Sequence, residues 1–93
     1  MAAKKQDKKY IIERVQTGIR VEKRLLKVLK ALAEYCDMTL GDLLEGIVLA
    51  SFDGHSPFTE TTLKTIDKFK EIYGLDLDSK ASHKMIEQHE LKT

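Results

Sequence analysis

The alternation of apolar and polar residues between positions 15 and 21 is the clearest strand pattern in the chain. The stretch reads Val15-Gln16-Thr17-Gly18-Ile19-Arg20-Val21, and every second position is apolar or small, as in a strand with one buried face. Residues 10–14 do not alternate cleanly, so the pattern leaves the start of the strand open by several residues. Because an isolated strand leaves backbone N–H and C=O groups unpaired, we expect its partner strand to come from a second copy of the chain.

Two helices follow the strand pattern. Apolar residues at spacings of three and four predict a first helix from Glu22 or Lys23 to about Tyr35, with a break at Asp37-Met38. Thr39 is the expected N-cap of a second helix that continues to about Phe52. The second helix is apolar over more than half of its circumference, which indicates burial by more than one partner helix and therefore a dimer core.

The last forty residues carry two weaker helical patterns. A third helix is predicted from Thr59 to Tyr73, with Gly74 as its stop, and a fourth from Ser79 to about Leu91. The region is acidic, and three roles for it stay open. It packs on a dimer core, mediates higher assembly, or presents a docking surface for another protein.

Charge is distributed unevenly along the chain. Residues 1–30 hold ten basic side chains against three acids, a net +7, whereas residues 31–93 hold six against twelve, a net −6. Residues 1–14 are expected to form a basic flexible arm. A basic end of this kind suits a polyanion such as nucleic acid, although a solvated lysine tail that only aids solubility is the plainer alternative.

The sequence lacks the spacing of metal-ligating or catalytic residues that would define a metal site or a catalytic centre. His83 and His89 are six positions apart and point to different sides of a helix, so we expect no metal site and no cofactor. Cys36 lies on the apolar face of the first helix and is expected to be a small core residue. No apolar run approaches the roughly 20 residues that cross a bilayer. We therefore expect a cytoplasmic protein that is not an enzyme and has no membrane partner.

The order of strand, helix, short turn and capped helix resembles the ribbon-helix-helix family of DNA-binding proteins (the MetJ, Arc and CopG group). The resemblance covers residues 15–52 and is carried by residues 17–21, 25–34 and 37–44. It implies a mainly α fold, a ribbon-helix-helix homodimer with a two-stranded intersubunit antiparallel ribbon and additional C-terminal helices. The expected domains are a DNA-binding and dimerisation domain over residues 15–53 and a helical extension over residues 54–93.

The resemblance also implies which residues contact double-stranded DNA. Outward side chains of the ribbon read bases in the major groove in such proteins, and these positions match Gln16, Gly18 and Arg20. Glycine has no side chain to read with, so Gly18 departs from the family pattern. Without the family pattern, the alternatives for Arg20 are an ordinary solvated side chain and an ion pair with Glu22. The residues implied as phosphate contacts are Thr39, Leu40 and Gly41 at the start of the second helix, together with Arg14 and Lys23.

Two classes of function follow from these observations. The first is a sequence-specific transcriptional regulator, a repressor that acts by occluding an operator, with neighbouring dimers packing along the DNA. The alternative is an antitoxin or a dimeric protein-interaction module, in which residues 56–93 bind a partner protein.

Overall fold

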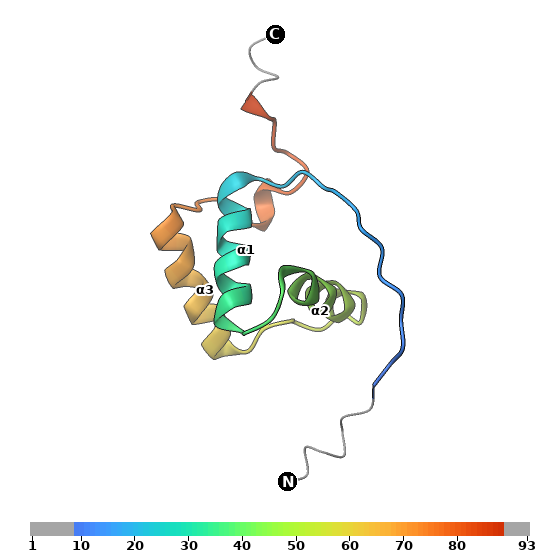
Figure 1. Cartoon of the computed structure of the whole chain (residues 1–93). Coiled ribbons are helices and arrows are strands. Elements are labelled where there is room, and N and C mark those ends of the chain that lie inside the picture. Colours follow the sequence, from blue (N-terminus) through green and yellow to red (C-terminus); the bar gives the residue numbers. More distant parts are fainter. Residues whose placement is uncertain (1–8, 89–93) are drawn as a thin grey trace.

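Three α-helices form the body of the protein in the computed structural model, which describes residues 9–88 (Figure 1). They are α1 (Lys23–Tyr35), α2 (Leu40–Phe52) and α3 (Glu60–Tyr73), followed by the short 3-10 helix η2 (Ser79–Ala81). α1 packs against both α2 and α3, and in Figure 1 it stands between them. The three expected helices are therefore confirmed, with bounds close to those expected from sequence.

Local side chains explain where these helices begin and end. Thr39 caps α2 by accepting a hydrogen bond from the Asp42 amide at 3.1 Å, as the sequence predicts, and Thr59 caps α3 in the same way. Gly74 ends α3 in the left-handed conformation, with φ 67°, which glycine adopts without a steric penalty. Asp37 takes the same region, with φ 57°, in the turn between α1 and α2.

A small apolar core lies where α1 meets the other two helices. Its buried centre consists of Leu32, Ala33 and Leu43, and partly buried side chains pack around it, among them Cys36, as expected from its place on the apolar face. Phe69 of α3 meets the ring of Tyr35 edge-on, with ring centroids 6.3 Å apart. This contact adds an aromatic pair to the α1–α3 packing.

The expected strand is wrong. Residues 9–22 run as an extended segment along one side of the molecule, and residues 9–88 contain no strand or sheet (Figure 1). Val15 and Ile19, expected to face inward, are 79% and 71% exposed. The physical reason is that alternation describes one strand only, and the described chain offers no second strand to hydrogen-bond with it. The mainly α architecture is correct, but the ribbon-helix-helix homodimer with an intersubunit ribbon is not the fold found.

The expected fourth helix is also wrong over the described residues. Between residues 79 and 87 only the 3-10 helix η2 forms, capped by Asp78 rather than Ser79, and residues 82–87 are not helical. The apolar side chains meant to hold this helix are too few and too poorly covered, since Met85 and Ile86 are exposed. Residues 1–8 of the basic arm and the end of the expected fourth helix lie outside the described residues.

α2 is covered much less than its apolar character suggests. Leu43 is buried, but Val48, Leu49 and Phe52 are exposed, and Phe52 is 80% exposed. Within one chain, therefore, α1 covers only one side of this helix. No helix among residues 9–88 combines the length and apolarity required to cross a lipid bilayer.

Candidate nucleic-acid interface

The three base-contact candidates lie on the extended segment that leads into α1. Gln16, Gly18 and Arg20 are all exposed there. A Cβ atom added to Gly18 would meet nothing within 4 Å, so lack of space does not require glycine at this position. The segment presents these residues without a sheet to hold them in register.

Arg20 is engaged by a carboxylate from the far end of the described chain. Its Nε atom donates to Glu87 Oε2 at 3.1 Å, and its second guanidinium nitrogen donates to the same oxygen. Glu22, which the sequence offers as an alternative partner, instead pairs with Arg24 at 3.0 Å and caps α1 by accepting from the Leu25 amide at 2.8 Å. Partial burial acts to raise the pKa of Glu22, but the Leu25 amide and the Arg24 guanidinium lower it overall.

The phosphate candidates at the start of α2 keep a geometry suited to an anion. The first amides of a helix have no acceptor within the helix, and they carry the positive end of its dipole. An added Cβ at Gly41 would meet nothing within 4 Å, so no neighbouring side chain crowds this position. Thr39 uses its side-chain oxygen for the cap, which leaves the hydroxyl proton as its donor.

Acidic side chains at the start of α2 oppose an anion, and Arg14 compensates for them. Its guanidinium donates to both carboxylate oxygens of Glu45, at 2.8 and 2.9 Å, and lies 3.9 Å from the carboxylate of Asp42. These contacts raise the pKa of Arg14, and its hydrogen bonds and charge lower the pKa of Glu45. Arg14 therefore lies beside the first turns of α2, with its Nε and one terminal nitrogen occupied by Glu45.

Lys23 lies apart from that group. It is the first residue of α1 and is exposed, as are Lys27 and Lys30 further along the same helix. α2 begins just beyond the opposite end of α1, which spans about 20 Å at 1.5 Å per residue. The phosphate candidates therefore form two groups, one at the start of α1 and one at the start of α2, and the base candidates lie between Arg14 and Lys23 in sequence.

The acidic partners of the arginines were not predicted from the sequence. Three carboxylates each pair with an arginine that is 31 to 67 positions away, namely Glu45, Asp76 and Glu87. The opposite net charges of residues 1–30 and residues 31–93 are consistent with such pairing. They do not say which acid meets which arginine, because that depends on how the helices pack.

Groups of three or more His, Cys, Asp or Glu side chains that could hold a metal ion do not occur among residues 9–88. Comparison of the chain with models of protein families, with curated proteins and with solved structures finds no match.

Proposed function

We propose that this chain is a cytoplasmic homodimer that binds double-stranded DNA and represses transcription by occluding the operator to which it binds. The observation that carries the proposal is the gathering of all three arginines, Arg14, Arg20 and Arg24, on the extended segment and the first turn of α1. Guanidinium groups suit phosphates and guanine edges because their planar fork of donors makes paired hydrogen bonds.

In this proposal the extended segment reads bases and the helix ends bind the backbone. Arg20 contacts guanine and Gln16 contacts adenine, while Gly18 allows the segment to approach the DNA closely without reading a base. Arg14, Lys23 and the first amides of α2 contact phosphates and fix the orientation of the protein. The sequence resemblance of residues 25–34 and 37–44 to the ribbon-helix-helix family supports this assignment, and no ribbon forms part of it.

The exposed face of α2 supports dimerisation. Leu49 and Phe52 are 62% and 80% exposed on a helix whose charged side chains, Asp42 and Glu45, both lie in its first half. Adjacent apolar side chains of this size on a small protein mark an interaction surface. A second copy that offers the same face would cover both helices together.

Selection of bound sequences from a pool of random duplexes tests the proposal. We expect an enriched motif with two half-sites, and binding whose log–log salt slope is about −4 to −5 if each dimer contacts four to six phosphates. A pool that yields no motif, with no mobility shift even at low salt, would overturn the proposed function.

The second candidate function is a protein-interaction module such as an antitoxin. It is favoured by apolar side chains left exposed near the ends of α2 and α3, namely Phe52 and Ile72. The middle of the α3 stripe is not available to a partner, because Ile66 and Phe69 pack on the core. Stoichiometric co-purification of a small basic protein that contacts residues 56–93 would favour an antitoxin, whose N-terminal half still binds DNA. The absence of any DNA shift at low salt would favour a dimeric module that binds only protein.

A further inference from the structure

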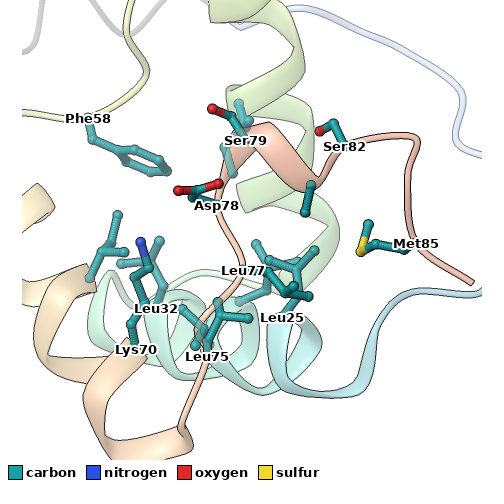
Figure 2. Close-up of a pocket in the computed structure, with 15 residues that line it drawn as sticks. Leu25, Leu32, Phe58, Lys70, Leu75, Leu77, Asp78, Ser79, Ser82 and Met85 are labelled. Carbon is teal, nitrogen blue, oxygen red and sulfur yellow. The ribbon is translucent and has the colours of Figure 1, made fainter.

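The chain after α3 turns back along α1 and is held there by leucines. Leu75 is buried, and Leu77 is partly buried. Both line a cavity of about 350 Å³ that is also lined by Leu25 and Leu32 of α1 (Figure 2). We refer to residues 75–88 as the return segment. Burial of its leucines anchors it to the helical body.

The return segment brings carboxylates to the arginines of the proposed DNA site. Asp76 Oδ1 accepts from Arg24 at 2.9 Å, and the Gly74 carbonyl beside it accepts from the same guanidinium nitrogen at 2.9 Å. Further along, Glu87 accepts from Arg20. Two of the three arginines are therefore engaged by one stretch of chain that is far from them in sequence.

Carboxylate and phosphate compete for a guanidinium because both accept the same pair of N–H donors. DNA can therefore contact Arg20 fully only when Glu87 releases it. Apolar burial of a leucine is worth more than an exposed ion pair. The return segment can consequently stay anchored by Leu75 while its carboxylates exchange with phosphates.

We propose that the return segment is an intramolecular competitor for DNA, with Glu87 and Asp76 occupying the positions of phosphate or base acceptors on Arg20 and Arg24. This inference rests on the proposed DNA-binding function and adds a regulation of the same site. It assigns the C-terminal part of the chain the role of weakening non-specific DNA binding. A non-specific DNA contact gains too little free energy to displace Glu87 from Arg20.

The test compares the DNA affinity of Glu87→Gln with that of Glu34→Gln, which removes the same charge from an exposed position on α1. Glu34 lies ten residues from Arg24, about 15 Å along the helix, which exceeds the Debye length of about 10 Å at 0.1 M salt. We expect Glu87→Gln to bind duplex about two- to five-fold more tightly than wild type at 0.1 M salt, the gain that an exposed ion pair allows. The control should change little, and the gain should shrink as ionic strength rises.

The double variant Asp76→Asn/Glu87→Gln, with Glu34→Gln/Asp67→Asn as its charge-matched control, extends the comparison to both arginines. Equal affinity of the target variants and their controls would overturn the competition and leave DNA binding intact. If only the target variants bind duplex, the competition is supported in a stronger form. If none binds, the proposed function fails and the competition fails with it.

The NMR signal of the Arg20 Nε–H group, compared between wild type and Glu87→Gln without DNA, tests the contact by itself. We expect the signal to shift in the variant. An unchanged signal would overturn the competition at Arg20 whether or not DNA binds.

Discussion

Arg14 and Glu45 join the extended segment to α2 through a bidentate ion pair. The Nε and terminal nitrogen of Arg14 each donate to a different carboxylate oxygen of Glu45, across 31 positions of sequence. Paired geometry of this kind fixes orientation as well as distance. Both side chains remain substantially exposed to solvent, so the pair is a modest contact that salt weakens. The placement of the extended segment on the helices is therefore sensitive to charge.

The Arg14–Glu45 pair predicts a loss of stability in acid. Because the folded-state pKa of Glu45 lies below its ordinary value of 4.5, the pair stabilises the fold above pH 4.5 and is lost as pH falls through the lowered pKa. Thermal melts of wild type and Glu45→Gln between neutral pH and pH 3 check this. The melting temperature of the variant should depend less on pH below 4.5, although Glu22 keeps a contribution of the same sign. Identical pH profiles would contradict the pair.

Leu32 should be the most costly side chain to shorten. It is 2% exposed and lies at the centre of the core, so Leu32→Ala should lower the free energy of unfolding by about 2–5 kcal/mol. A core with so few buried residues has little reserve against such a loss. Urea denaturation followed by circular dichroism measures the change. Leu63→Ala is the control, because Leu63 is exposed, and it should cost clearly less. Equal costs would place the core elsewhere.

The helices were predictable because the information that specifies them is local. Thr39, Thr59 and Gly74 mark helix ends through contacts within three or four positions, and the apolar spacing marks the buried face. The fourth helix failed on the same criterion, since its apolar set was too thin to hold it. Local patterns therefore predicted each helix to within a residue or two where packing also supported it.

The site was less predictable, because its contacts are not local. The alternation at residues 15–21 describes one strand and says nothing of a second strand to pair with it. The exposed positions of Gln16 and Arg20 were correctly expected, but the pairing of Arg20 with Glu87 depends on the return of the chain after α3. Val15 and Ile19, which the pattern placed inward, are exposed as well, so the pattern did not separate exposed from buried positions on this segment. Packing decided which carboxylates reached its arginines.

Gly74 should resist replacement by a residue with a β-carbon. Its φ of 67° lies in the left-handed region, which costs other L-residues roughly 1–2 kcal/mol, so Gly74→Ala should lower the free energy of unfolding by about 1 kcal/mol. Gly74→Asn should cost less, because asparagine visits this region more readily. Chemical denaturation of the two variants gives the order. A less stable Asn variant would show that another property of the position dominates.

Phe52 should control the oligomeric state. Placing a charge on an exposed face costs a monomer little, but it blocks an apolar interface, so Phe52→Asp should convert the proposed dimer to monomer. Light scattering after size exclusion measures the mass. Ile72→Asp is the matched control, because Ile72 is also an exposed apolar residue but lies on α3, and it should leave the dimer intact. A dimer that survives Phe52→Asp would exclude this face of α2 as the interface.

Arg20 should determine specificity at one base pair. If its guanidinium reads a guanine, Arg20→Ala should cost about 1–3 kcal/mol on the selected site and relax the preference at that position alone. Lys27→Ala provides the contrast, because Lys27 is exposed on α1 and lies outside the segment proposed to read bases. It should weaken all sequences alike and reduce the salt slope by about 1 if it meets a phosphate. Affinities for the site and for its single-base variants, measured at one salt concentration, separate the two effects. If Arg20→Ala folds normally and binds every sequence as wild type does, base reading by the extended segment is wrong.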